Sequence, residues 1–372
     1  MKILIFNWQD SKNPLAGGAE VHLHEVFSRI AKMGHDVTLY CSSFKGALHE
    51  EDMNGIHVIR EGGRYLFNYR VMFKYLTHFR NQGYDLVIDD MNKIPFFTPL
   101  YVRKPLYIVT HHLFDKSIFL EASWPIAMYV YLTEKLGFNL CKSRRIPFIV
   151  GSPSTKGELL ERGFPSSQIE IINYCVDHDI HRKNEAKRSP TPLIGYFGRI
   201  KKYKSVEHLL HAFSRLVKEK PDLKLVVVGE GDNRKVLEQL SAELKITGNV
   251  HFTGFVSEEE KVEYLQKVWF AVNTSSKEGW GLTVIEANAC GTTVIASNVP
   301  GLRDAVKDGE TGLLYEFGNI DQLTGGIRRL LDDPAYRQKL ADSAYAWAAT
   351  FDWNNAARRT LDLLEQRIGK RL

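Results

Sequence analysis

Short apolar runs alternate with amphipathic stretches along most of the chain. The apolar run at residues 2–8 is followed by a stretch at 19–34, where Val21, Phe27 and Ile30 recur at helical spacing and Gly34 provides a stop. Further strand-sized runs in the first half lie at residues 36–43, 84–90, 106–112 and 147–154. This alternation is typical of βαβ units, in which helices cover a parallel sheet.

The second half repeats the scheme with clearer turns. Its predicted strands lie at residues 192–198, 223–229, 249–255, 269–276 and 292–298, with helices at 206–220, 233–246 and 257–268. Residues 176–193 are charged, contain prolines and lack an apolar period, which is typical of a linker. The pattern therefore predicts an α/β protein of two doubly wound, Rossmann-like domains facing each other across a cleft, an N-terminal domain at 1–180 and a C-terminal one at 190–350.

Length and composition agree with this interpretation. A chain of 372 residues suits two domains, and 44% hydrophobic with 25% charged residues is typical of a folded protein. The net charge of +5 favours anionic ligands but is too small to indicate a nucleic-acid partner. Four scattered cysteines without a CxxC pair argue against a zinc site and fit a cytoplasmic protein. The N-terminus resembles a strand more than a signal peptide, and no 18-residue apolar run predicts a membrane span.

The segment at 275–291 joins a predicted strand to a short helix through Gly279 and Gly281, with Glu278 and Glu286 eight positions apart. The first amides of a helix have no partner inside the helix, so such a turn is a ready phosphate site. A carboxylate beside a phosphate costs about 3 kcal/mol at an effective dielectric near 20. The two glutamates are therefore expected to bind sugar hydroxyls, unless they are only solvated helix residues.

Cations for such a site follow the first strand of the second half. Arg199 and Lys204 lie in the loop after that strand and are expected on the same side of the sheet as the glycine turn. Arginine suits bidentate phosphate contacts, and lysine acts as a point charge. The alternative is a basic loop exposed for solubility. Gly17 and Gly18, at a helix start in the first half, are a weaker phosphate signal, because no GxGxxG pattern accompanies them.

Taken in order, these stretches resemble the family 4 glycosyltransferases, enzymes with two Rossmann-like domains in the GT-B arrangement. "EGWGLTVIEANACGTTV" resembles that family's pair of glutamates separated by seven residues. Further resemblances are "GGAE", "GRIKKYK", "VVVGEGD", "VHFTGFV" and "NVPGLRDAVKDGETGLLY", which together extend over nearly the whole chain. Trp280, Ser205 and Thr293 stand where phenylalanine, glycine and proline are usual, and none of these changes removes a charge.

The resemblance implies a nucleoside diphosphate sugar as co-substrate and a role for each matching position. Glu286 would hold the ribose and Glu278 the donor sugar, and Phe255 and Val256 would lie near the base. The remaining implied contacts are Trp280 and Gly281 to the sugar, Leu282 and Thr283 to the diphosphate by their amides, and Arg199, Lys204, Gly17 and Gly18 to the diphosphate.

The family also implies a histidine at a strand tip of the first domain, and His112 fits its spacing better than His111. Retention of anomeric configuration is implied, without a metal or another cofactor. Asp177 and Asp179 form an Asp-x-Asp pattern, but they lie in the predicted linker. The helix at about 353–372 would pack back on the first domain. A related epimerase or phosphorylase, or a non-catalytic nucleotide-sugar-binding membrane scaffold, are the alternatives.

The acceptor is predicted only as a class, a glycan or glycolipid such as a lipid-linked or envelope-glycan precursor. Residues 62–83 and 111–145 mix aromatic and aliphatic residues with Arg and Lys, as is typical of segments at an anionic membrane surface. These segments predict peripheral association with the inner face of a membrane. The alternatives are core helices near the cleft or a dimer interface.

Overall fold

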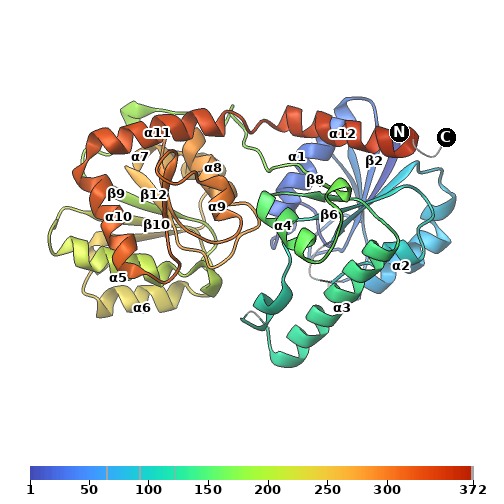
Figure 1. Ribbon diagram of the computed structural model, residues 1–372, viewed down its shortest axis with the longest axis horizontal. Helices are drawn as coiled ribbons and strands as arrows, with labels where there is room; N and C mark the ends of the chain where they lie inside the picture. Colours follow the sequence, from blue (N-terminus) through green and yellow to red (C-terminus); the bar gives the residue numbers. More distant parts are fainter. Residues whose placement is uncertain (64–65, 92–93, 121, 370–372) are drawn as a thin grey trace. The chain divides into compact units, whose positions relative to one another are not determined.

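The computed structural model describes residues 1–63, 66–91, 94–120 and 122–369 (Figure 1). The chain divides into two compact units. Unit 1 comprises Met1–Tyr174 and Trp353–Leu372, and unit 2 comprises Cys175–Asp352. The division falls shortly before the end of the predicted first domain. The last residues of the predicted C-terminal helix, 370–372, lie outside the described residues.

Unit 1 is built on an eight-stranded sheet with the order β3-β4-β2-β1-β5-β6-β7-β8. All its neighbouring strands are parallel except the β3–β4 pair. The strands are β1 (Lys2–Phe6), β2 (Asp36–Cys41), β3 (Glu50–Met53), β4 (Ile56–Arg60), β5 (Leu86–Met91), β6 (Leu106–Thr110), β7 (Phe148–Val150) and β8 (Ile169–Ile171). The strand order reverses direction between β1 and β5, so the loops after these strands diverge at a topological switch point.

Strand β1, at the centre of the unit 1 sheet, is apolar after Lys2. Ile3, Leu4, Ile5 and Phe6 of β1 are completely buried, which is the burial expected of a parallel strand covered on both faces. The antiparallel strand β3 was not predicted, because its sequence EEDM lacks an apolar run. It lies at the sheet edge, where charged residues are tolerated and oppose unwanted strand pairing.

In the described residues of unit 1, four α-helices come from the N-terminal segment and one comes from the end of the chain. They are α1 (Gly18–Lys32), α2 (Phe67–Thr77), α3 (Trp124–Ser143), α4 (Pro153–Glu161) and α12 (Trp353–Gly369). α12 packs against α1, and Asn354 accepts a hydrogen bond from Nε of Arg29 at 3.2 Å (Figure 1). The C-terminal helix therefore belongs to the first unit, although the residues that precede it belong to unit 2.

Unit 2 has a six-stranded parallel sheet with the order β11-β10-β9-β12-β13-β14. Its strands are β9 (Leu193–Phe197), β10 (Lys224–Val228), β11 (Val250–Gly254), β12 (Phe270–Asn273), β13 (Val294–Ser297) and β14 (Gly312–Tyr315). The order reverses between β9 and β12. The loops that follow these two strands are those in which the sequence places the candidate cations and the glycine turn.

Among the described residues, unit 2 has seven α-helices, of which the first four were predicted from the sequence and the last three were not. They are α5 (Val206–Val217), α6 (Arg234–Glu243), α7 (Glu258–Lys267), α8 (Leu282–Ala289), α9 (Leu302–Ala305), α10 (Ile320–Asp332) and α11 (Pro334–Ala348). The apolar stripe of α5, including Leu209, Leu210 and Phe213, is completely buried. The amphipathic spacing read from the sequence therefore marks the face that covers the sheet.

Residues 176–193 were predicted to be a linker, but the structure holds much of the segment against unit 2. Arg188 donates hydrogen bonds to the carbonyl of Gly291 at 2.9 Å and to Oγ1 of Thr292 at 2.8 Å. Gln266 donates from Nε2 to the carbonyl of Arg182 at 2.6 Å. Polar contacts hold this segment in place. Its sequence therefore lacks the apolar periodicity by which an ordered element is predicted.

Candidate active site

Hydrogen bonds join the loops that follow β9 and β12, the two strands at the switch point of unit 2. Oγ1 of Thr274, after β12, donates to the carbonyl of Lys204 at 2.8 Å, and the amide of Ser276 donates to the carbonyl of Tyr203 at 2.8 Å. Because β9 and β12 are neighbouring parallel strands, the loops after them leave the same edge of the sheet. The structure thus brings together the two segments that the sequence predicted to share a site.

Lys204 and Glu278 form an ion pair between these loops. The two side chains are only 13% and 16% exposed, and Oγ of Ser275 also donates to Glu278, at 2.7 Å. Both contacts use Oε1 of Glu278. Burial alone would lower the pKa of Lys204, but the charge of Glu278, aided by Tyr203 and Tyr196, leaves that pKa raised. Lys204 is therefore a permanent cation at this edge of the sheet.

The turn between Glu278 and α8 depends on two glycines. Gly281 precedes the first residue of α8 with φ of +86°, a left-handed conformation that glycine adopts without strain. At Gly301, in the loop after β13, an added Cβ would lie 2.3 Å from the carbonyl oxygen of Glu278. Glycine at 301 thus lets that loop support the turn. The first amides of α8, those of Leu282 and Thr283, open the helix that follows Glu278.

Trp280 occupies the same turn, but its ring points into unit 2. It is 3% exposed and contacts Phe351 edge-on, with ring centroids 5.2 Å apart. Its Nε1 is buried without a hydrogen-bond partner. The side chain therefore packs inside unit 2 and supports the turn. Only the backbone of Trp280 remains as a candidate contact to a sugar.

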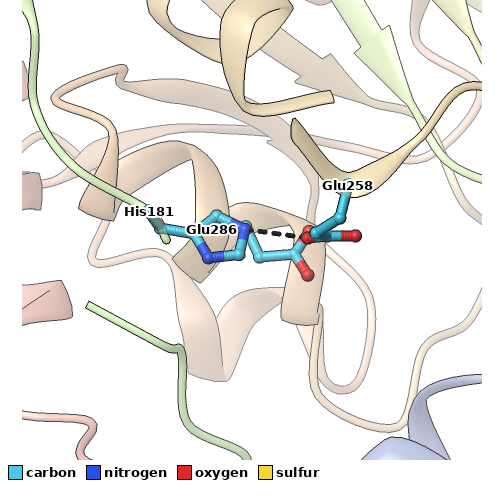
Figure 2. A group of neighbouring side chains, drawn as sticks. All are labelled: His181, Glu258 and Glu286. Carbon is cyan, nitrogen blue, oxygen red and sulfur yellow. Dashed lines mark ion pairs between the residues drawn. The ribbon is translucent and has the colours of Figure 1, made fainter. Parts of the chain in front are cut away.

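Glu286, on α8, pairs with a lysine that the sequence analysis did not identify. Its Oε2 lies 3.1 Å from Nζ of Lys261 on α7, and Nζ also lies 2.7 Å from Oε1 of Glu258. His181 approaches the same Oε1 with its Nε2 at 3.2 Å (Figure 2). Glu286 is 7% exposed, so Lys261 compensates a carboxylate that burial alone would strongly disfavour.

In this second cluster, the positive charge of Lys261 and the negative charges of Glu258 and Glu286 stabilise one another. Burial would lower the pKa of Lys261, but Glu286 and Glu258 leave it raised. Burial would likewise raise the pKa of Glu258, yet His181 and Lys261 lower it to about 2. One ligand atom from each of His181, Glu258 and Glu286 lies within 4.8 Å of the others, a spacing that suits a metal ion (Figure 2). The ammonium of Lys261 already supplies positive charge to both carboxylates.

The remaining predicted residues of unit 2 lie at the same sheet edge. Arg199, in the loop after β9, has an exposed side chain, and its carbonyl accepts a hydrogen bond from the Tyr196 hydroxyl at 3.2 Å. Phe255 follows β11 and is 88% exposed, while Val256 beside it is half-buried. An aromatic ring so exposed at the carboxyl end of a strand is available for stacking.

In unit 1, Gly17 precedes α1 and Gly18 is its first residue, directly after the loop from β1. The amide of Gly17 donates to Oε2 of Glu20 at 2.7 Å. The Gly17 amide thus has a partner inside the protein. Glu20 is 3% exposed, and burial raises its pKa despite this hydrogen bond.

The two histidines after β6 lie in different environments. His111 is buried, with Nε2 at 2.7 Å from Oδ1 of Asp90 and Nδ1 in contact with the Tyr174 hydroxyl. Burial would lower the pKa of His111, but Asp90 raises it above the ordinary value. His112 is half-buried and its ring contacts that of Phe114, with centroids 4.4 Å apart. His111 is thus held inside unit 1, and His112 is the more accessible of the two.

Sequence reasoning did not identify Lys261, Glu258, His181 or Ser275 as part of the site. Glu258 and Lys261 are three residues apart on α7, a spacing that places them on one helix face. That spacing marks them as neighbours of each other, but nothing in the sequence relates them to Glu286 on another helix. Only the packing of α7 against α8 does so.

The family model "Glycosyltransferase Family 4" matches residues 16–180, and "Glycosyl transferases group 1" matches residues 177–347. The chain belongs to the family 4 glycosyltransferases. An uncharacterized glycosyltransferase, MJ1607 of Methanocaldococcus jannaschii, is 23% identical to this glycosyltransferase, over 98% of this chain and 97% of the relative. The D-inositol 3-phosphate glycosyltransferase of Frankia alni is 36% identical, but the match spans about half of each chain, 52% of both.

Solved structures share the fold of this glycosyltransferase over its full length. Sucrose-phosphate synthase (tll1590) from Thermosynechococcus elongatus superposes with a TM-score of 0.82 at 21% identity and 100% coverage of both chains. Anabaena Alr3699/HepE, in complex with UDP-glucose, has a TM-score of 0.77 at 18% identity and covers 98% of this chain and 100% of its own. The prediction of a GT-B fold with two Rossmann-like domains is confirmed.

The enzyme class predicted from the sequence, a glycosyltransferase, is confirmed as well. None of the helices in the described part of the glycosyltransferase combines the length and apolar character that a membrane span requires.

Proposed function

We propose that this glycosyltransferase moves a hexose from a nucleoside diphosphate sugar, UDP- or GDP-linked, to a hydroxyl acceptor with retention of anomeric configuration. The observation that carries the proposal is the Lys204–Glu278 pair beside the start of α8. Lys204 and Ser275 both contact Oε1 of Glu278, so Oε2 is available for a hydroxyl of the donor sugar. The pair therefore provides an acceptor for the sugar and a cation for the diphosphate at one point.

Glu286 takes the ribose hydroxyls in this proposal. An ionised carboxylate is a strong acceptor of hydroxyl hydrogen bonds, and Lys261 keeps Glu286 compensated in a buried place. Phe255, with Val256, takes the base by stacking its exposed ring. HepE was solved with UDP-glucose, which favours a uridine donor for this chain too.

The diphosphate lies between the two glutamates. The amides of Leu282 and Thr283, Lys204 and the exposed Arg199 face the developing negative charge of the leaving group, and fixed donors of this kind lower the barrier electrostatically. The backbone of Gly17 and Gly18 is a further proposed contact of the diphosphate, although the Gly17 amide must then share its hydrogen with Glu20. The amides of Trp280 and Gly281, and the ring of His112, are the proposed contacts of the sugar. With these cations we propose no requirement for a metal ion or another cofactor.

The proposed acceptor is a glycan or glycolipid hydroxyl, such as that of a lipid-linked or envelope-glycan precursor. Support comes from the exposed apolar surface of unit 1, described below, because such a surface suits an enzyme that works beside a membrane.

The test starts from a thermal-shift screen of UDP- and GDP-sugars, with NAD as a negative control. One donor is expected to raise Tm, and the same donor, labelled in the sugar, is then supplied with candidate acceptors in buffer containing EDTA. Transfer to a second molecule with the donor's anomeric configuration, read by NMR, supports the proposal. Stabilisation by NAD alone, inversion, or epimerised donor without transfer contradicts it.

A further inference from the structure

Two neighbouring helices of unit 1 expose large apolar side chains on the faces that do not pack on the core. On α2 and the residue before it these side chains are Leu66, Tyr69, Met72, Phe73 and Leu76, and on α3 they are Trp124, Ile126, Tyr129, Leu132 and Leu136. We call these ten residues the α2–α3 face. Single exposed apolar residues are ordinary, but a continuous group of this size marks an interaction site.

The two halves of the α2–α3 face adjoin. The hydroxyl groups of Tyr69 and Tyr129 lie 3.1 Å apart, within hydrogen-bond distance. Both helices also pack on the same segment of chain, since Asn68 donates to the carbonyl of Ile94 at 2.7 Å and a Cβ at Gly137 would meet the ring of Pro95. The exposed residues therefore form one surface rather than two separate stripes.

Both helices are apolar on two sides. Phe67, Val71 and Tyr75 of α2 are buried on the core side, while Phe73 on the opposite side is 67% exposed. On α3, Val130 and Phe138 are buried, while Trp124 is 67% exposed. A helix with apolar residues all round has a second environment besides the core. The alternative of core helices near the cleft accounts for the buried faces of α2 and α3, but not for the exposed apolar ones.

Basic residues predominate among the charges around the face. Residues 66–83 include Arg70, Lys74 and Arg80 and no acidic residue. On α3 the acidic residue Glu134 is buried and accepts hydrogen bonds from the amides of Phe114 and Asp115, both at 2.8 Å, whereas Lys135 is exposed. Glu61 pairs with Arg70 and Lys74, so the positive charge is strongest toward Arg80, Lys135 and the end of α3 at Arg144 and Arg145.

We infer that the α2–α3 face docks on an anionic lipid bilayer, with its apolar side chains in the interface and its basic residues at the headgroups. Trp, Tyr, Phe and Leu on one face beside Lys and Arg match the chemistry of that interface, in which rings lie at headgroup level and cations meet anionic lipid. The helices lie in the membrane plane, since none in the described residues is suited to span it. This inference rests on the proposed function in one respect only: docking would give the enzyme access to a membrane-bound acceptor.

The test is co-sedimentation of the full-length chain with vesicles, without donor or acceptor, so that it can fail while glycosyl transfer stands. Vesicles of phosphatidylglycerol and phosphatidylcholine are compared with pure phosphatidylcholine at low and high salt. The double variant Phe73→Ser/Trp124→Ser is compared with Val236→Ser/Phe317→Ser, which removes apolar residues 54% and 43% exposed in unit 2. Circular dichroism and Tm show that each variant folds.

We expect the wild type and the unit 2 variant to bind anionic vesicles, and the Phe73/Trp124 variant to partition at least tenfold more weakly. Lys135→Glu is expected to weaken binding to anionic vesicles only. Absence of wild-type binding to anionic vesicles at low salt, or equal binding of neutral ones, overturns the inference. So does light scattering that shows a dimer which the Phe73/Trp124 variant converts to monomer, because the face would then bind a second copy.

Discussion

Lys204 and Glu278 neutralise one another where the loops after β9 and β12 meet. The two residues come from positions far apart in the sequence, and the contacts of Glu278 with Lys204 and Ser275 both use Oε1, which leaves Oε2 for another partner. The pair explains how a carboxylate can lie beside a phosphate site, because its charge is already compensated. A donor diphosphate then meets a nearly neutral group, and the repulsion expected between phosphate and carboxylate is reduced.

Replacing Lys204 with Met removes this compensation. We expect kcat to fall by about 10²-fold or more, since the leaving diphosphate loses a fixed cation and Glu278 becomes an uncompensated charge. Steady-state kinetics with the donor found by thermal shift measure the effect. Lys202→Met is the matched control, because Lys202 is exposed in the same loop. Equal kinetics of the Lys204 and Lys202 variants would contradict the role of Lys204.

Replacing Lys261 with Met is expected to weaken donor binding more than turnover. Without Lys261, the carboxylates of Glu286 and Glu258 repel each other, so Glu286 is a poorer acceptor for the ribose. The expected change is a rise of about tenfold in the donor KM with kcat within a few-fold, the signature of lost uniform binding.

The control for Lys261 is Lys267→Met on the same helix, because Lys267 is 45% exposed and pairs with Glu263. Lys261→Arg should restore much of the affinity if the positive charge is what matters. A loss of kcat at constant donor KM would show that Lys261 acts in another way.

Trp280 is expected to matter for stability through its bulk rather than its indole nitrogen. Trp280→Ala should lower the free energy of unfolding by about 3–5 kcal/mol, because a buried ring against Phe351 is lost. Trp280→Phe should cost less, since Nε1 has no partner to lose, and should keep activity within a few-fold. Urea unfolding and kinetics measure both. A Phe variant as unstable as the Ala variant would show that the indole makes an essential contact.

Asp89 gives unit 1 a pH dependence. Burial, opposed in part by the Thr98 hydroxyl, raises the pKa of Asp89 to about 7 from 3.8. The folded protein thus holds a proton that the unfolded chain releases near pH 4. Its contribution to the free energy of unfolding is fully present below about pH 4 and is lost as pH rises to about 7.

Asp89→Asn has no such proton to lose and retains an acceptor for Thr98. We therefore expect the variant to gain stability relative to the wild type as pH rises from about 4 to about 7, by roughly 1.4 kcal/mol per pH unit at most. Chemical unfolding across this pH range measures the difference. Asp36→Asn, at an exposed position, should show no such trend. A stability difference for Asp89→Asn that is constant with pH would contradict the assignment.

The sequence determined the alternation of strands and helices, the glycine turn before α8 and the family. These features are local, because apolar periodicity and glycine positions reflect the backbone within one element. The carboxyl edge of the unit 2 sheet also followed from the sequence, since consecutive parallel strands place their loops together. For the same reason Arg199, Lys204 and Glu278 could be assigned to one edge before their contacts were known.

The tertiary structure alone decided which charges meet. Lys261 and Glu286 lie on separate helices, and the pairing of His111 with Asp90 joins two strands. The sequence also did not show that α2 and α3 each expose a second apolar face. Periodicity identifies which residues of a helix share a face, but not whether another element covers that face. Contacts between distant segments depend on how elements pack, and a single sequence carries no local signal for them.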